Sequence, residues 1–382
     1  MLRRWFVSAV AVSLAPGVMA LSSPARASGV ANGASARNAA RIASVGLFPP
    51  VRRLDQPPEP VPTGVERIGA APRLNSDGTV APTAGPAQRA AVAILDTGIT
   101  DRPDLNVVGR HDCTGAGSTE DEDGHGTHVA GIVAGRGLPG VFGVSPGTPL
   151  YAVRVLGSNG SGSISDVICG LNWVADHAAA DNIKVVNMSL GDHGSDDRHC
   201  GATDNDAFHA AVCRVTAAGV MVVSAAGNDG GDLAQNVPAA YDEVLTVTAM
   251  ADYDGKPGAA SPSRRCGHGA PDDSAPDFSS YAVPGSADAD HTIAAPGVCI
   301  TSTWKDGGTN VLSGTSMASP HVAGLVARCI DAGPCAGMTP AEIIAKLRSD
   351  AAGRPAEQGF VGDTHQPLNG KYYGNLAWDR GY

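Results

Sequence analysis

Short apolar runs alternate with segments of helical period along most of this 382-residue chain. A strand that helices cover on both faces is apolar throughout, because neither of its faces meets water. Strands that alternate with helices need crossover connections, which make neighbouring strands parallel. The sequence therefore predicts an α/β fold with three layers (αβα) around a mostly parallel, twisted sheet. The expected strands are residues 91–95, 151–156, 184–190, 220–225 and 244–247.

Helical patterns lie between and after these runs, at residues 163–180, 206–218 and 319–329. A last helix is indicated by Thr339-Pro340-Ala341-Glu342. A threonine can cap the first turn, proline fits the first helical position, and a glutamate at the third can return a hydrogen bond to the cap. We therefore expect this helix to begin at Pro340.

The first 27 residues have the pattern of a signal peptide. Arg3-Arg4 is followed by a short apolar run, Trp5 to Leu14, and Ala25-Arg26-Ala27 has the small-x-small pattern of a cleavage site. The arginine pair resembles a twin-arginine signal, but Leu2 stands where Ser or Thr is usual, so Sec export stays open. We expect a secreted, extracellular protein that has no membrane partner once the signal peptide is removed.

Residues 28–60 are rich in Ala, Pro and Arg and have no sustained period, which is typical of a linker or a short pro-segment. One folded domain is expected over residues 61–382. The net charge of −11 and an aromatic content of 4% argue against a nucleic-acid partner, which would need a basic surface or stacking rings. No feature of the sequence calls for a second copy, so we expect a monomer.

Export makes disulfides the expected state of the eight cysteines, none of which forms a Cys-x-x-Cys zinc pattern. Eight cysteines allow about 105 pairings, so spacing alone does not fix the connectivity. Local closures favour Cys200–Cys213, Cys266–Cys299 and Cys329–Cys335, which leaves Cys113–Cys169.

Asp96-Thr97-Gly98 follows an apolar run, at an end of the sheet where sites form. The tripeptide is the carboxylate signature of aspartic proteases. That class needs a second copy or a short homodimeric chain, the chain has neither, and Ile99 stands where the signature has Ser or Thr. The other interpretations are a turn and a carboxylate that orients a histidine.

The stretch Asp123–Gly135, DGHGTHVAGIVAG, places His125 near the start of a helix that is rich in small residues. His125 and His128 are three residues apart, which raises the question of a metal. The His-Glu-x-x-His pattern of zinc proteases is absent. A structural histidine and a histidine that projects into a cleft both remain open.

The stretch Ser313–Gly324, SGTSMASPHVAG, places Ser316 between a glycine turn and a helix expected to begin near Ala318, with Pro320 in its first turn. A serine nucleophile needs this position, because free N–H groups at a helix start can stabilise an oxyanion. A helix cap is the alternative. The stretch does not match the Gly-x-Ser-x-Gly elbow of α/β-hydrolases.

Together the three motifs, in the order Asp, His, Ser, resemble the subtilisin-like serine protease family (peptidase S8). The resemblance covers the chain from about Val61 and rests on DTGI at 96–99, GHGTHVAG at 124–131 and GTSMASPH at 314–321. It implies a serine endopeptidase in which Ser316 attacks, His125 transfers the proton and Asp96 orients His125.

Other segments match the family as well. AAGND at 225–229 assigns the oxyanion-hole amide to Asn228. GSG at 160–162 and SLG at 189–191 resemble the two edges that hold an extended polypeptide substrate, and 225–227 resembles a wall of the pocket for the substrate side chain. The implied substrate-binding residues are Gly160, Ser161, Gly162, Ser189, Leu190, Gly191, Ala225, Ala226 and Gly227.

The chain departs from the family in three places: the pro-segment, the calcium regions and the residues before His125. Only residues 28–60 lie between the signal and the mature-like start, which is short for the family's usual pro-domain, and Arg52-Arg53 is a candidate processing site.

Residues 136–143 are shorter than the usual calcium loop and lack its amide side chains, and Thr292 stands where a carboxylate is expected. The prediction therefore names no metal ligand and no catalytic cofactor, and leaves structural calcium open, with Asp104 as one candidate. The acidic run Glu120–Asp123 is expected to be a solvated loop, and the alternatives are that it raises the His125 pKa or binds a cation.

Three functions remain open at this point. The protein is an endopeptidase, an esterase that uses the same residues, or a catalytically silent binding protein of the same fold.

Overall fold

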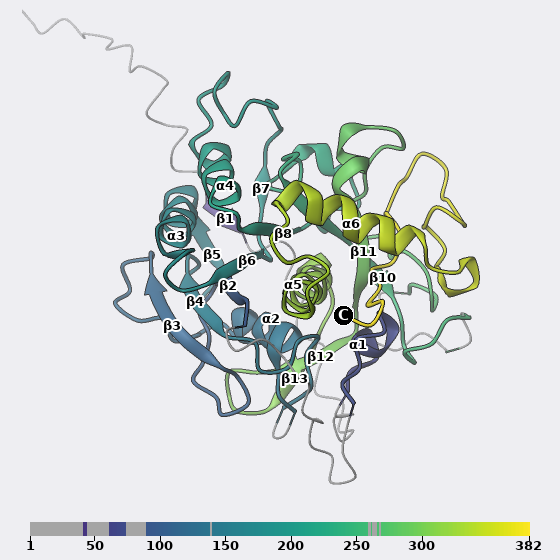
Figure 1. Ribbon diagram of the computed structural model, residues 1–382, viewed down its shortest axis with the longest axis horizontal. Coiled ribbons are helices and arrows are strands. Elements are labelled where there is room, and N and C mark those ends of the chain that lie inside the picture. Colours follow the sequence, from purple (N-terminus) through teal and green to yellow (C-terminus); the bar gives the residue numbers. More distant parts are fainter. Residues whose placement is uncertain are drawn as a thin grey trace, which may run out of the picture. The chain divides into compact units, whose positions relative to one another are not determined.

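A seven-stranded sheet, parallel throughout, forms the centre of the computed structural model (Figure 1). The structure describes residues 41–43, 61–73, 89–137, 140–258, 261, 266 and 269–382, all within one compact unit, residues 38–382. The strand order is β11-β10-β8-β6-β2-β4-β3. Their bounds are β2 Ala91–Asp96, β3 Val107–Asp112, β4 Leu150–Arg154, β6 Ile183–Met188, β8 Met221–Ala225, β10 Val244–Ala251 and β11 Thr292–Val298.

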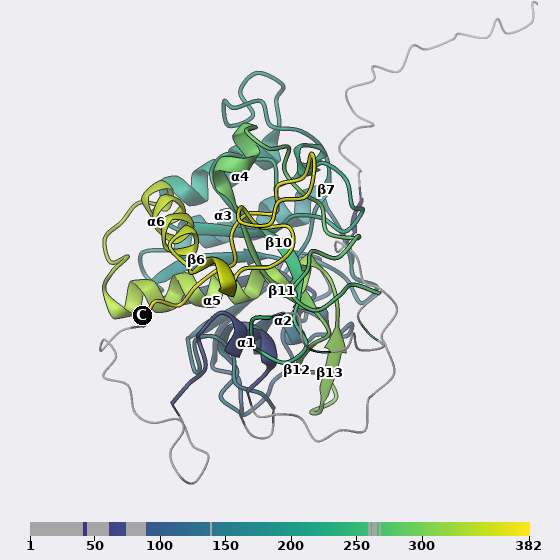
Figure 2. The same cartoon turned by 90° about the vertical axis from the view of Figure 1, so that its right-hand side faces the viewer.

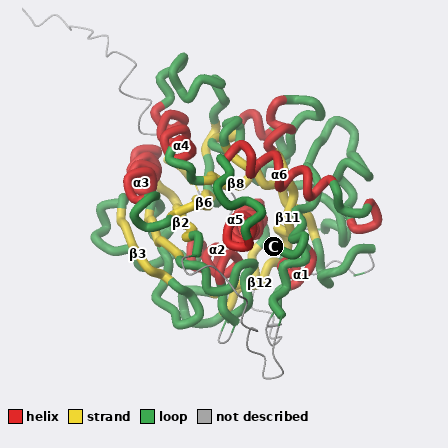
Figure 3. Tube along the Cα trace, in the orientation of Figure 1, coloured by secondary structure: helices red, strands yellow, loops and turns green. Residues whose placement is uncertain are grey.

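Helices cover both faces of this sheet, so the predicted three-layer αβα fold is confirmed (Figures 2 and 3). One face packs against α2, His125–Ala134, α5, Thr315–Ala332, and α6, Pro340–Ala352. The other packs against α3, Ile164–His177, and α4, Ala207–Ala217. Every residue of the four strands β2, β8, β10 and β11 is buried, which explains their unbroken apolar runs.

The expected strands and helices are present, with ends that differ by a few residues. Two sheet strands, β3 and β11, were not predicted. Both lie at sheet edges. β11 was missed because Pro296 and Gly297 interrupt the apolar pattern in its sequence. The strand can still form because an edge strand has one side without a neighbouring strand, where proline's missing N–H costs no hydrogen bond. Exposure alternates along most of β3, so it has no continuous apolar run.

Short elements complete the described part of the chain. They are β1 Arg41–Ala43, α1 Thr63–Arg67, β5 Ser161–Ser163, β7 Asp192–His193, β9 Asn236–Val237, β12 Ile300–Thr303, β13 Thr309–Leu312, and the 3-10 helices η2 Leu233–Gln235, η3 Ala287–His291 and η4 Ala356–Gln358. α6 begins as predicted, with the reciprocal cap between Thr339 and Glu342. Within the described residues, no helix combines the length and the apolar character that crossing a membrane requires. The predicted signal peptide lies outside the described residues.

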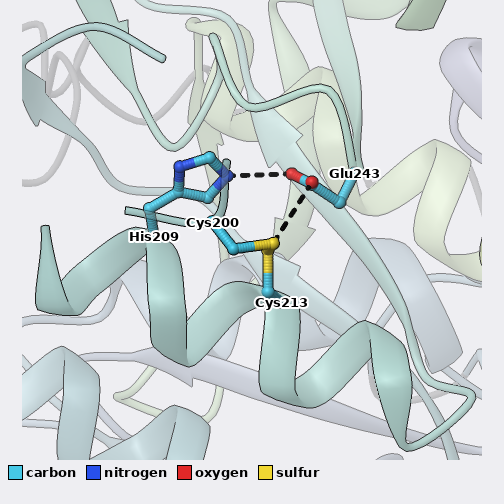
Figure 4. Close-up of side chains that lie close together, drawn as sticks. All are labelled: Cys200, His209, Cys213 and Glu243. Carbon is cyan, nitrogen blue, oxygen red and sulfur yellow. Dashed lines mark hydrogen bonds and ion pairs between the residues drawn. A yellow bond between two sulfur atoms is a disulfide. The ribbon is translucent and has the colours of Figure 1, made fainter. Parts of the chain in front are cut away.

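All four expected disulfides are confirmed: Cys113–Cys169, Cys200–Cys213, Cys266–Cys299 and Cys329–Cys335. Cys200–Cys213 ties the loop that precedes α4 to that helix, beside His209 and Glu243 (Figure 4). A covalent link of this kind limits the freedom of the unfolded chain and so stabilises the fold.

Candidate active site

Asp96 ends β2 and is fully buried. Its carboxylate accepts a hydrogen bond from the Thr97 backbone N–H at 2.8 Å. Nδ1 of His125 lies 2.8 Å from one carboxylate oxygen and 3.0 Å from the other. The structure therefore brings two of the predicted site residues into direct contact, with Nδ1–H as the donor and Asp96 as the acceptor.

Gly126 makes this contact possible. A Cβ atom at residue 126 would lie 2.1 Å from the Gly98 carbonyl oxygen and 3.1 Å from the Cβ of Asp96. Only glycine lets the first turn of α2 approach the end of β2 this closely. The Gly-His-Gly sequence is thus a packing requirement as well as a motif.

The acidic run before His125 is not a solvated loop throughout, and that prediction is wrong for Asp121. Asp121 is 3% exposed and accepts hydrogen bonds from the Thr97 and Thr127 hydroxyls and from the backbone N–H groups of Gly124 and Thr127. With the backbone N–H of Asp123, five donors compensate the burial of this carboxylate, and the continuous acidic run gave no sign of them. Asp121 fixes the start of α2 and therefore the position of His125.

These carboxylates also act on the charge of His125. Burial alone lowers the pKa of this imidazole, but the charge and hydrogen bond of Asp96 oppose that effect. Asp123 and Asp121 add negative charge nearby, so the pKa of His125 is raised above its ordinary value. His128, by contrast, bonds through Nε2 to the carbonyls of Ile300 and Asn310, and burial lowers its pKa to about 3. His128 is a buried structural histidine.

Ser316 lies in the first turn of α5, because the helix begins at Thr315. The expectation of a start near Ala318 was wrong, and Pro320 lies in the helix interior. Ser316 is 1% exposed, and its hydroxyl donates to the Ser189 carbonyl at 3.3 Å. Helices α2 and α5 pack side by side, so the helices that carry His125 and Ser316 are neighbours (Figure 1).

Asn228 is held by the residue before Ser316. The backbone N–H of Thr315 donates to Asn228 Oδ1 at 2.8 Å, and the Thr315 hydroxyl donates to the same oxygen at 2.9 Å. With Oδ1 fixed as an acceptor, the Nδ2 group points away from Thr315. The sequence pattern assigned Asn228 but gave no signal for Thr315, whose role depends on a contact 87 residues away in the chain.

The two expected substrate edges lie at the ends of different elements. Ser161 and Gly162 belong to β5, with Gly160 just before it, and Ser189-Leu190-Gly191 follows β6. An extended segment of the chain itself lies on one of them: β1 pairs antiparallel with β5, with Arg41 opposite Ser163, Ile42 opposite Gly162 and Ala43 opposite Ser161. The β5 edge thus accepts an extended backbone.

The expected pocket wall, residues 225–227, follows β8. Ala225 and Ala226 are buried, and the Gly227 N–H donates to the Thr315 hydroxyl at 3.2 Å. Asn236 donates to the Ala226 carbonyl at 3.2 Å. Gly227 has a φ of +116°, a conformation that favours glycine, and a Cβ there would also lie 2.4 Å from Asn236 Nδ2.

Asp104, the one calcium candidate from the sequence, has a cation partner within the chain. Both its oxygens accept hydrogen bonds from Arg102, each at 2.9 Å, and both side chains are buried. A bidentate guanidinium neutralises the charge that would attract a metal ion.

A second group of titratable residues surrounds His209 on α4 (Figure 4). Nε2 of His209 lies 3.0 Å from Glu243, and Nδ1 lies 3.2 Å from Asp197 and 3.4 Å from Asp196. Burial lowers the pKa of His209, but the hydrogen bond and charge of Glu243, with both aspartates, outweigh burial and raise it. No motif marked this group.

With this geometry in place, comparison with known sequences decides the family. The sequence model of the subtilase family matches residues 87–374. This chain belongs to the subtilase family of peptidases. The match includes Asp96, His125, Asn228 and Ser316.

Individual relatives agree with this assignment. A thermostable alkaline protease of Halalkalibacterium halodurans is 38% identical over 240 residues, which cover 62% of this chain and 56% of that protein. Subtilisin DY of Bacillus licheniformis is 38% identical over 242 residues, which cover 62% of this chain and 74% of that protein. Subtilisin Savinase of Lederbergia lenta is 36% identical over 269 residues, covering 70% and 83%. The matched region thus spans little more than half of the alkaline protease.

Solved structures agree as well. Sphericase has a TM-score of 0.66 and 29% identity, covering 86% of this chain and 100% of its own. A cold-adapted subtilisin-like serine proteinase has a TM-score of 0.61 and 27% identity, covering 85% and 100%.

Proposed function

We propose that this subtilase is a secreted serine endopeptidase that hydrolyses peptide bonds of extended polypeptides. The observation that carries the proposal is the 2.8 Å contact between His125 Nδ1 and buried Asp96, close to a helix whose first turn holds Ser316. A carboxylate on Nδ1 keeps the proton there and leaves Nε2 as the base.

In the proposed reaction, Ser316 Oγ attacks the scissile carbonyl carbon while His125 Nε2 takes the hydroxyl proton. The negative charge that develops on the carbonyl oxygen is stabilised by Asn228 Nδ2–H and by the Ser316 backbone N–H at the start of α5. His125 then returns the proton to the leaving amine, and water repeats the sequence on the acyl-enzyme. These steps use no cofactor.

The pairing of β1 with β5 supports a polypeptide substrate rather than a small ester. A peptide that adds to a strand edge gains affinity from main-chain hydrogen bonds, which tolerate many sequences. Residues 41–43 make this kind of contact within the region proposed as a linker or short pro-segment. A segment on this edge would compete with substrate until it leaves or is cut. N-terminal sequencing of the secreted protein would locate the mature start.

The experiment is labelling with a fluorophosphonate probe, followed by peptide mapping. We expect one adduct at Ser316, no adduct in Ser316→Ala, and an unchanged adduct in the control Ser313→Ala. The labelled form should lose activity on casein. A mature wild-type protein that is not labelled would indicate a silent binding protein of this fold. Hydrolysis of a short ester without cleavage of casein would indicate an esterase.

A further inference from the structure

Helix α5 lacks one of its own hydrogen bonds at Ser316. In an α-helix, each carbonyl accepts from the N–H four residues later. For Ser316 that residue is Pro320, which lies inside α5 and has no N–H. Proline also crowds the carbonyl four residues before it. The backbone carbonyl of the proposed nucleophile therefore needs a donor from outside the helix.

Ser189 supplies that donor. Its hydroxyl donates to the Ser316 carbonyl oxygen at 2.8 Å, across 127 residues of sequence. In return, the Ser316 hydroxyl donates to the Ser189 carbonyl at 3.3 Å. Ser189 lies on the proposed substrate edge after β6, so the two bonds join that edge to the first turn of α5.

Asn187, in β6, determines the direction of the Ser189 hydroxyl. Its Nδ2 donates to Ser189 Oγ at 3.0 Å, and its Oδ1 accepts from the Ser319 hydroxyl at 2.8 Å. A hydroxyl has one proton, and because Asn187 already donates to Ser189, that proton is directed to Ser316. Asn187, Ser189 and Ser319 are all fully buried, so water does not compete for these bonds.

We propose that Asn187 and the Ser189 side chain are positioning residues for Ser316: they supply from β6 the hydrogen bond that Pro320 removes from α5. The inference rests on the proposed function, in which Ser316 is the nucleophile. The orientation of its peptide unit is then set by the substrate edge rather than by its own helix. The backbone N–H and Oγ of Ser316 are held in register with the bound peptide.

A mutant cycle between Ser189 and Pro320 tests this directly. Ser189→Ala should lower kcat about tenfold and leave KM within about threefold, because misplacement of a reacting group reduces turnover more than binding. Pro320→Ala restores an N–H at the helical position. In the Ser189→Ala background it should recover most of the lost kcat.

Asn187→Leu, which removes both side-chain bonds at similar volume, should lower kcat in the same direction as Ser189→Ala but by less. The matched control is Ser302→Ala. Ser302 is a buried serine whose hydroxyl donates to the His128 carbonyl in α2 at 2.7 Å, where the helical donor is Ile132 rather than a proline. Its kcat should stay within about threefold of the wild type.

The same mutant cycle can be measured by thermal unfolding in the Ser316→Ala background. This variant cannot digest itself, and it still has the backbone carbonyl at residue 316 that accepts the Ser189 hydrogen bond. Ser189→Ala should lower Tm by about 2–4 °C with Pro320 present, the cost of one hydrogen bond, and by clearly less with Pro320→Ala. Additive effects of the two substitutions in both kcat and Tm would overturn the inference. If the wild type neither hydrolyses peptide nor is labelled, the proposed function fails, and the Tm cycle still decides whether Ser189 replaces the helical donor.

Discussion

Two buried histidines, His125 and His209, both lie against carboxylates, and both have raised pKa values. They differ in which ring nitrogens are engaged. In the described part of the chain, carboxylates contact His125 at Nδ1 alone, whereas at His209 both nitrogens face them. His125 therefore retains a nitrogen that can take up a proton, whereas His209 is suited to stay an imidazolium that holds its neighbours together.

The two histidines also differ in what they connect. His125 joins the start of α2 to the end of the central strand β2. His209 joins α4 to Glu243, which precedes β10 (Figure 4), and to Asp196 and Asp197, which lie just before Cys200. Its ring stacks on Tyr241, with the two ring centroids 4.0 Å apart. A raised histidine pKa alone thus does not identify a catalytic base. The proposed base also has a ring nitrogen, Nε2 of His125, that no carboxylate contacts among the described residues.

The strongest test removes the carboxylate from each histidine in turn. Asp96→Asn should lower kcat by about four orders of magnitude, because the amide favours the wrong imidazole tautomer, while the protein stays folded. Glu243→Gln, the matched change at His209, should leave kcat within about threefold. Steady-state hydrolysis of a peptide substrate measures both. Equal losses of kcat in the two variants would contradict the conclusion that His125 and His209 have different roles.

Asn228→Leu tests whether the Asn228 side chain stabilises the oxyanion. Loss of one oxyanion donor should reduce kcat by about 10²–10³-fold with little change in KM, a magnitude that the known effect in subtilisin itself provides. Asn172→Leu, on the opposite helix layer in α3, is the control for a general effect of removing an amide. An unchanged rate in Asn228→Leu would refute its assignment.

His209→Gln should separate stability from activity. Removing one partner of a fully buried ion pair costs about 3–5 kcal/mol, and the loss here should be smaller because the Glu243 side chain is 30% exposed to solvent. We expect a lower Tm by calorimetry with a kcat within about threefold of the wild type, assayed well below the new Tm. A comparable loss of kcat at full stability would place His209 in the catalytic machinery.

The stability should also depend on pH through His209. Its pKa is raised in the folded protein by Glu243, Asp196 and Asp197. Its contribution is therefore fully present below the unfolded-state pKa, about 6.5, and is lost as pH rises through the folded-state value. Unfolding midpoints measured across this range should fall more steeply in the wild type than in His209→Gln. Parallel curves would contradict this assignment.

The smallest expected effect is a shift in the pH–rate profile. Asp123 contributes negative charge that raises the His125 pKa, so Asp123→Asn should move the acid limb of kcat/KM to lower pH. Glu120→Gln changes the same charge at an exposed residue in the same run and should move the limb less. A shift of the limb to higher pH in Asp123→Asn would contradict the electrostatic argument.

The layered fold was predicted from apolar runs, and the candidate site residues were assigned from short motifs. Three disulfides were predicted as local closures, whereas Cys113–Cys169, 56 residues apart, followed only as the remaining pair. The features that were missed depend on contacts distant in the chain. The start of α5 was placed too late because Pro320 removes a helical donor, and Ser189, 127 residues away, replaces it. In sequence Asp121 has the pattern of a surface charge, but in the fold it also accepts a hydrogen bond from the Thr97 hydroxyl, 24 residues away.

The most direct test of the central claim is the pH dependence of phosphonylation at Ser316, followed by intact-mass measurement in the wild type and in His125→Ala. If Ser316 is the nucleophile and His125 its base, the wild-type rate should rise with pH to a plateau as His125 loses its proton, and His125→Ala should react orders of magnitude more slowly without that limb. Equal rates in the two proteins, or an adduct on another serine, would contradict the account.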